Sequence, residues 1–158
     1  AGVFVWKNFL DLSFDDWSRT IDTQLSLPFR MTQAFARAWK EAATNVSPSV
    51  INIGSIHGPV GDPNVVAQCA AKAGLIGLTR ATAEALRPNG IRVNAILAGA
   101  IEPDSPTRLS ADAWAKITQG DLAQLALYLA SDASRGLTGS PIEAYGVTRP
   151  VIGSPKKE

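Results

Sequence analysis

The chain has little of what would assign it to several broad classes of protein. Among its 158 residues Cys69 is the only cysteine, so no internal disulfide can form and an oxidising compartment is not indicated. No apolar run approaches the roughly 20 residues that span a bilayer. Fifteen basic residues balance fourteen acidic ones, which argues against nucleic acid or an anionic membrane as a partner. We expect a soluble, cytoplasmic protein with no metal site.

A glycine-rich phosphate-binding turn is also missing. The chain has 13 glycines, but none of them are spaced as G-x-G-x-x-G, the pattern that seats a dinucleotide pyrophosphate on a helix N-terminus. The chain begins with Ala1. Either an initiator was removed or the sequence is a piece of something longer, and the residues leave both open.

What is present is the pattern of one α/β domain. Short β-branched runs alternate with helical stretches, which favours parallel strands joined by helices. Ser13 and Asp16 fit a capping box that opens the first helix, and Pro28 interrupts its apolar stripe. The sequence predicts strands at 49–54, 91–97 and 140–145, helices at about 14–43, 65–87 and 121–131, and an irregular loop at 98–111.

Two glycines lie inside the predicted helix at 65–87. Glycine in a helix interior costs up to about 1 kcal/mol relative to alanine, so it is retained where it serves packing. Gly74 and Gly77 therefore predict that another element approaches this helix closely.

In order and spacing these elements resemble the second half of the short-chain dehydrogenase/reductase family, and of 3-oxoacyl-(acyl-carrier-protein) reductases in particular. The phrases that carry the resemblance are Ala1–Gly2, Asp11–Trp17, Ile51–Gly58, Gln68–Lys72, Asn89–Asn94, and Leu129–Asp132 with Thr138–Gly139. The resemblance covers residues 1–147 and leaves 148–158 as a tail. It implies a truncated Rossmann-like, three-layer α/β fold with a parallel sheet of about three strands.

The site that the resemblance implies is altered in this chain. The family uses Asn, Ser, Tyr and Lys; Ser55 and Lys72 stand at two of these positions, whereas Gln24 replaces the Asn and Gln68 replaces the Tyr. An amide cannot exchange a proton with a substrate oxygen as a tyrosine hydroxyl does. In the following family loop Gly99 and Ile101 remain as vestiges, and Pro103 replaces a threonine that contacts the nicotinamide.

The resemblance also implies a cofactor and partners. The family binds NAD(P), but we expect no cofactor for this chain alone, and NAD(P) only if an upstream segment or partner chain supplies the missing half. The strand at 50–53 would lie on an open edge, which invites association. The helices 14–43 and 65–87 resemble the family's dimer interface, so we expect a homo-oligomer, or a hetero-oligomer with a full-length family member.

The sequence leaves three hypotheses for the function of this chain. The leading hypothesis is a non-catalytic structural or regulatory subunit that acts through these helices. The first alternative is an NAD(P)-dependent oxidoreductase or a fragment of one. The second is a lyase or hydratase that uses Ser55 and Lys72, with His57 as a substitute base. A structural or solvent-facing role for His57 is the more common outcome for such a residue.

Overall fold

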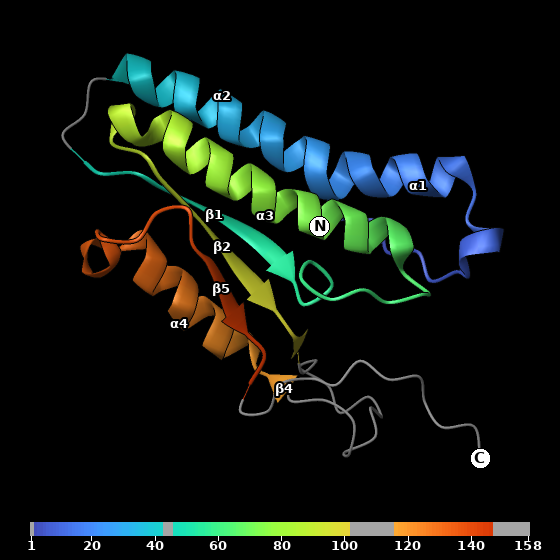
Figure 1. The fold of residues 1–158 in the computed structure, drawn as a ribbon. Helices are drawn as coiled ribbons and strands as arrows, with labels where there is room; N and C mark the ends of the chain where they lie inside the picture. Colours follow the sequence, from blue (N-terminus) through green and yellow to red (C-terminus); the bar gives the residue numbers. More distant parts are fainter. Residues whose placement is uncertain (1, 43–45, 102–115, 147–158) are drawn as a thin grey trace.

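Three parallel strands form the sheet around which the chain is organised. A computed structural model describes residues 2–42, 46–101 and 116–146. Strands β1 (Ser49–Ser55), β2 (Arg92–Ala98) and β5 (Pro141–Ala144) lie in the order β1-β2-β5, and both pairings are parallel (Figure 1). The prediction of three parallel strands is confirmed.

Strand β2 is the centre of this sheet. Every residue of β2 is buried, which fits an apolar strand covered on both faces and paired on both edges. Its register with β1 places Ile53 opposite Ile96 and Ser55 opposite Ala98. The two strands therefore end together, at the edge of the sheet where the predicted site residues gather.

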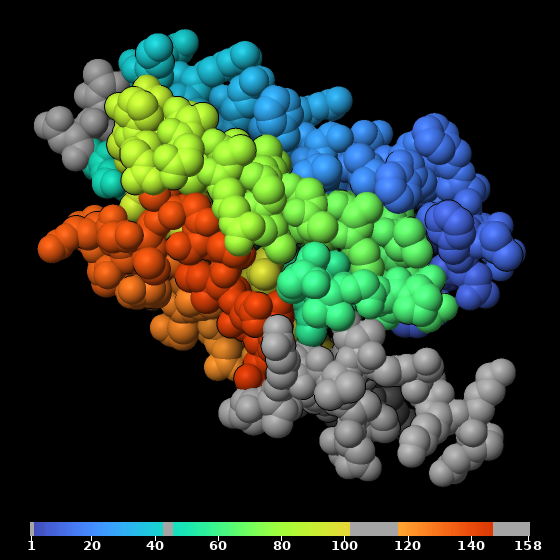
Figure 2. Space-filling model, in the orientation of Figure 1, coloured from blue at the N-terminus to red at the C-terminus, as the bar shows by residue number. Residues whose placement is uncertain are grey.

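The helices form a layer on each face of the sheet. Helix α3 (Val66–Leu86) packs against β1 and β2 on one face, and α4 (Gln119–Ala130) packs against the same strands on the other. Helices α1 (Phe14–Ile21) and α2 (Leu27–Ala42) lie beside α3 in its layer. Figure 2 shows them as adjoining bands of surface, α1 and α2 in blue and α3 in green. The three-layer, Rossmann-like architecture is confirmed.

The first predicted helix is two helices joined by a π-helical segment. Ser13 caps α1, since its Oγ accepts a hydrogen bond from the Asp16 amide at 3.1 Å. Between α1 and α2 the chain winds as a π-helix over Asp22–Ser26. Pro28 follows this segment directly and, because the helix is continuous there, its missing N–H removes a donor from the helical ladder. The predicted break is therefore at the right place, but the chain stays helical through it.

The prediction of an irregular loop at 98–111 is wrong for its first residues. Strand β2 continues to Ala98, and a short strand β3 (Ala100–Ile101) pairs in parallel with β4 (Lys116–Ile117). Helix α4 begins at Gln119 because Thr118 and Asp121 cap it reciprocally, the Thr118 Oγ1 accepting from the Asp121 amide at 3.1 Å. Pro103 and the tail at 148–158 lie outside the described residues.

The two helix glycines have different surroundings. A Cβ added at Gly74 would lie 2.8 Å from Leu25 Cδ2, so the prediction of close approach is confirmed there. A Cβ at Gly77 would meet nothing within 4 Å. Within this chain the prediction is wrong for Gly77, whose position faces open space.

Two observations concern membranes and metals. Across the described ranges, each helix is either too short or too polar to cross a bilayer. In that same part of the chain, no group of three or more His, Cys, Asp or Glu side chains could hold a metal ion. The cytoplasmic location stays a prediction.

A buried amide on β2 provides a test of this architecture. Asn94 is fully buried; its Nδ2 donates to Leu137 O at 2.9 Å, and its Oδ1 accepts from the Ser140 amide at 3.1 Å. We expect Asn94→Ala to lower the free energy of unfolding by about 2 kcal/mol, because buried backbone groups lose their partner. Urea unfolding measures this, with exposed Asn89→Ala as a control expected within about 0.5 kcal/mol of wild type. Equal stability of the two variants would contradict the proposed role of Asn94.

Candidate functional site

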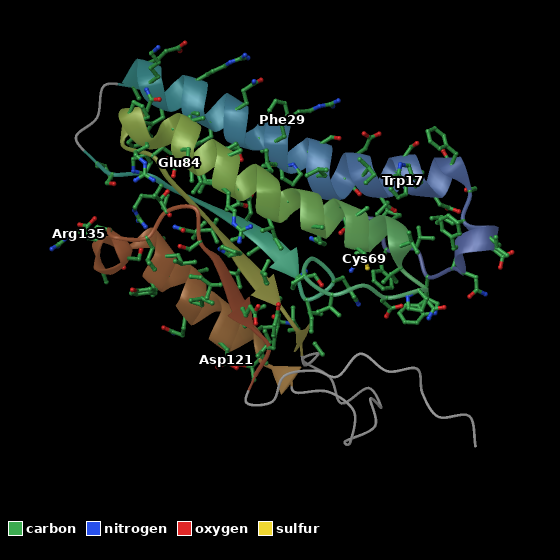
Figure 3. All side chains as sticks on the ribbon, viewed as in Figure 1. Trp17, Phe29, Cys69, Glu84, Asp121 and Arg135 are labelled. Atoms are coloured by element: carbon green, nitrogen blue, oxygen red, sulfur yellow. The ribbon has the colours of Figure 1, made fainter. Side chains whose placement is uncertain are left out.

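The predicted site residues lie at the carboxyl end of β1 and along the start of α3. Figure 3 labels Cys69 near the N-terminal end of α3, beside the loop that follows β1. Ser55 is the last residue of β1, and its Oγ accepts a hydrogen bond from the His57 amide at 3.2 Å. Carboxyl ends of parallel strands are where open α/β sheets bind ligands, so this placement suits a site.

His57 turns back towards Ser55 and joins it to α3. Its Nδ1 lies 3.4 Å from Ser55 Oγ and 3.2 Å from Gln68 Nε2. Its Nε2 lies 3.8 Å from Asp62 Oδ2. Burial lowers the pKa of His57 from its ordinary value of 6.5, and the nearby Asp62 charge opposes that effect. The expectation that His57 lies on the same side as Ser55 is met.

Gln68 stands in the first turn of α3 at the position of the family tyrosine. Its side chain is buried, and Nε2 contacts His57. Its Oε1 is a buried acceptor with no hydrogen-bond partner among the described residues. The amide therefore offers hydrogen bonds but no exchangeable hydroxyl proton at this point.

Lys72 follows Gln68 by one helical turn but is engaged elsewhere. Its Nζ donates to Ile53 O at 2.9 Å, and burial lowers the pKa of its ammonium. In a parallel pair, alternate residues of a strand direct their backbone N–H and C=O groups at the same neighbour. Just outside the two ends of β1, Arg92 N donates to Pro48 O and Ile56 N donates to Ala98 O, so the even-numbered residues are the ones that face β2. Odd-numbered Ile53 then directs its carbonyl at the open edge. Lys72 thus binds the edge of the sheet, and among the described residues no hydrogen bond joins it to Ser55.

Gln24 lies in the π-helical segment at the position of the family asparagine. Its side chain is buried, and Nε2 donates to Val3 O at 2.6 Å. A Cβ added at Gly2 would lie 3.2 Å from Gln24 Cγ, so Gly2 lets the N-terminal segment pass close to it. π-segments recur at functional sites. Here the segment turns Gln24 inward to hold the chain that precedes α1.

The open edge of β1 borders a groove of about 550 Å³. It runs between β1 and the helical layer. Apolar and polar side chains line it, among them Gln24, Leu27, Met31, Val50, Ile53 and Lys72. Ile53 is 52% exposed, which is unusual for an apolar strand residue. The prediction that residues 50–53 form an open edge is confirmed for this chain.

Two side chains near the site, Asp62 and Cys69, were not predicted from the sequence to belong to it. Asp62 is held beside His57 by the loop, because its amide donates to Cys69 Sγ at 3.3 Å and its Oδ1 accepts from the Asn64 amide at 2.8 Å. Cys69 is half-buried and fixes this loop. The signal was an acidic residue within a Gly- and Pro-rich turn after His57, which composition alone does not distinguish from a solvated loop.

The described residues do not fit a complete dinucleotide. Strand β1 is followed by a loop with no G-x-G-x-x-G spacing, and the N-cap of α3 is Val65, which makes no side-chain cap hydrogen bond. The N-terminus of α4 is already occupied by the Asp121 carboxylate, which would repel a pyrophosphate. Gly99 donates its amide to Ala144 O and packs against Tyr145, and Ile101 lies in β3.

Comparison with known proteins agrees with this geometry. Residues 1–146 match a family model described as enoyl-(acyl carrier protein) reductase. The chain belongs to the short-chain dehydrogenase/reductase family. The (3R)-3-hydroxyacyl-CoA dehydrogenase of Homo sapiens is 35% identical, with 92% of this chain and 59% of that protein covered. The 3-oxoacyl-(acyl-carrier-protein) reductase of Salmonella typhimurium is 33% identical, with 92% and 63% covered.

A solved short-chain dehydrogenase/reductase structure shows the same fold. 4-Hydroxyisoleucine dehydrogenase complexed with NADH superposes with a TM-score of 0.81 at 32% identity, covering 94% of this chain and 66% of that one. This chain thus spans 59% to 66% of the length of these three proteins. The family resemblance read from the sequence is confirmed, and the chain corresponds to part of the family domain.

The single histidine allows a clean test of the site. Because burial lowers its folded pKa, His57 is held neutral in the folded protein, and the unfolded chain binds the proton more readily. Its contribution to stability is therefore present above pH 6.5 and lost as pH falls through the folded pKa. Imidazole NMR titration should give a pKa below 6.5. Urea unfolding of His57→Asn should lack this component of the pH dependence, and an NMR pKa at or above 6.5 would contradict the burial.

Proposed function

We propose that this chain is the C-terminal, substrate-side part of an NAD(P)-dependent short-chain dehydrogenase/reductase domain. The complete domain would interconvert a hydroxyl and a keto group. The relatives support this class, since their names describe a 3-hydroxyacyl-CoA dehydrogenase and a 3-oxoacyl reductase. A hydroxyacyl or oxoacyl compound is therefore the substrate class we propose.

The observation that carries the proposal is the position of Ser55. It lies at the carboxyl end of β1, within 3.4 Å of a histidine nitrogen that also contacts Gln68, and its hydroxyl can hydrogen-bond a substrate oxygen there. Because Gln68 stands at the tyrosine position, the chain lacks the side chain that would transfer a proton in this reaction. Proton transfer by a positioned side chain contributes roughly 10²–10⁴-fold to rate, and an amide cannot supply it. We therefore propose that the oxidoreductase step is slow in this chain.

A hybrid protein tests this proposal. Joining this chain to the preceding segment of the Salmonella reductase would supply the nucleotide-binding half that the family places before residue 1. We expect Gln68→Tyr in that hybrid to raise the rate of NADPH-dependent reduction of a 3-oxoacyl thioester by about 10²–10⁴-fold. Loss of NADPH absorbance measures the rate.

Gln68→Phe is the matched control for that experiment. Phenylalanine resembles tyrosine in size but has no hydroxyl, so it reproduces the packing change without the proton. It should leave the hybrid slow. If the hybrid with Gln68 turned over as fast as the tyrosine variant, the proposed deficit would be wrong.

A second candidate is a non-catalytic structural or regulatory subunit, and the exposed face of the helical layer favours it. On α2, Phe29 is 45% exposed and lies outside the groove beside β1, whereas the exposed Leu27, Met31 and Phe35 line that groove. On α3 the small residues Ala73 and Gly77 are exposed one turn apart. Small residues let a second helix approach closely, so this face suits association with a second copy or with a full-length family member.

Gly77 allows this association to be blocked without disturbing the fold. A side chain at this position meets nothing within 4 Å in the chain itself, and Gly→Arg in a helix adds up to about 1 kcal/mol of helix stability. We expect wild type to sediment as a dimer or larger species, and Gly77→Arg to sediment as a monomer with unchanged or higher thermal stability. Gly77→Ala is the control that should keep the assembly. A monomeric wild type that also fails to bind the Salmonella reductase would exclude this candidate.

A further inference from the structure

One cluster of polar side chains has a geometry that also suits a reaction other than hydride transfer. It consists of Ser55, His57, Asp62 and Gln68. All four side chains come from one short stretch of the described chain, and His57 contacts each of the other three. We propose that Ser55 is a nucleophile activated by His57, and that this site hydrolyses activated acyl esters or thioesters. This activity needs neither a cofactor nor a second chain.

Ser55 has the surroundings of an activated hydroxyl. A serine is a weak nucleophile unless an adjacent base accepts its proton. His57 Nδ1 lies 3.4 Å from Ser55 Oγ, a spacing at which a small closure on substrate binding completes the hydrogen bond. The His57 amide donates to the same Oγ at 3.2 Å, so the oxygen is held in place at the end of β1.

His57 has the protonation state and orientation that a base requires. Burial lowers the pKa of His57, which leaves the imidazole neutral at pH 7. The Asp62 carboxylate lies 3.8 Å from Nε2 and favours the tautomer with its proton there. Nδ1 then carries the ring's one lone pair, which faces both Ser55 Oγ at 3.4 Å and the Gln68 Nε2 donor at 3.2 Å. The nearby Lys72 ammonium is bound to Ile53 O, and Asp62 is the charge that acts on the ring.

Gln68 supplies the remaining group that acyl transfer needs. Its amide is 8% exposed and contacts His57 with Nε2, while Oε1 has no partner among the described residues. The assignment of amide oxygen and nitrogen follows from the hydrogen-bond network, and either orientation leaves one buried polar atom unmatched. A buried unmatched atom is costly unless a bound molecule satisfies it. Nε2 donates one N–H to His57 Nδ1, and its second N–H can donate to the oxyanion of a tetrahedral intermediate, whereas Oε1 can only accept.

The reaction balances with water as the only co-reactant. Ser55 Oγ forms a bond to the acyl carbon while its proton passes to His57 Nδ1. The bond from the acyl carbon to the leaving alkoxide or thiolate then breaks, and His57 returns the proton to that group. Water attacks the acyl-serine, again giving its proton to His57, and the Ser55 oxygen leaves with that proton as the acid is released.

Labelling of the wild-type chain tests the proposal directly. We expect a fluorophosphonate probe to modify Ser55 and no other described serine, as located by peptide mass spectrometry, because only Ser55 has a contacting imidazole. p-Nitrophenyl butyrate and butyryl thioester should be hydrolysed, with a rate that falls as His57 protonates below pH 6.5. An adduct spread over several serines, or none at Ser55, overturns the proposal without any variant having to fold.

Variants separate the roles within the cluster. Ser55→Ala should abolish the adduct and His57→Asn should slow hydrolysis about 10²–10⁴-fold. Gln68→Ala should slow it about 10²–10³-fold, as expected for loss of an oxyanion donor. Ser47→Ala changes an exposed serine just before β1, at the opposite end of that strand from Ser55, and should match wild type. If Ser55→Ala, folded by circular dichroism, hydrolysed the esters as fast as wild type, Ser55 would not be the nucleophile. The hybrid oxidoreductase assay is independent of this result.

Discussion

Parallel pairing of β1 with the buried strand β2 is the constraint on which the rest of this structure depends. Because β2 is buried along its whole length, its neighbours must pair with it in one register and the two helical layers must cover it. That register ends β1 and β2 at the same level, with Ser55 opposite Ala98. The loop after β1 then returns over the sheet edge to α3. The site is assembled from this one strand–loop–helix connection.

Much of this architecture could be predicted from the sequence because it rests on local patterns. The β-branched run around Ile51, the Asn89–Gly90 turn and the Ser13 cap each have one favoured local structure. The π-segment at Asp22–Ser26 is different, since its only signal was a proline whose usual effect is to end a helix. The pairing of β3 with β4 joins two-residue strands across a long connection, and no period can be read from two residues. Gly77 shows the same limit, because the sequence pattern of a helix glycine does not tell whether another element of the chain lies against it.

The site was predictable in part, for the same reason. Ser55, Lys72, Gln24 and Gln68 could be found because the family motif fixes their positions in the sequence. Their contacts could not, since those depend on how a short loop folds back. Asp62 reaches His57 only because the Cys69 thiol accepts its amide and holds the loop. The hydrogen bond from Lys72 to the carbonyl of Ile53 is likewise a contact that the family motif does not imply.

That lysine links the open edge to the site. A strand added beside β1 in register would direct an N–H at Ile53 O, the carbonyl that now receives the Lys72 ammonium on the exposed side of the sheet. The Lys72 ammonium is part-buried in the groove, and burial lowers its pKa. A hydrogen-bond acceptor therefore stabilises its charged form. A strand that covers the edge therefore has one of two effects. Either its N–H and the Lys72 ammonium share the Ile53 carbonyl, or Lys72 is released towards the side of α3 on which Gln68 lies, one turn away. In the first case the edge and the cluster at Ser55 stay independent. In the second, occupation of the groove adds a positive charge beside His57 and lowers its proton affinity further, so that the state of one sheet edge sets the chemistry at its carboxyl end.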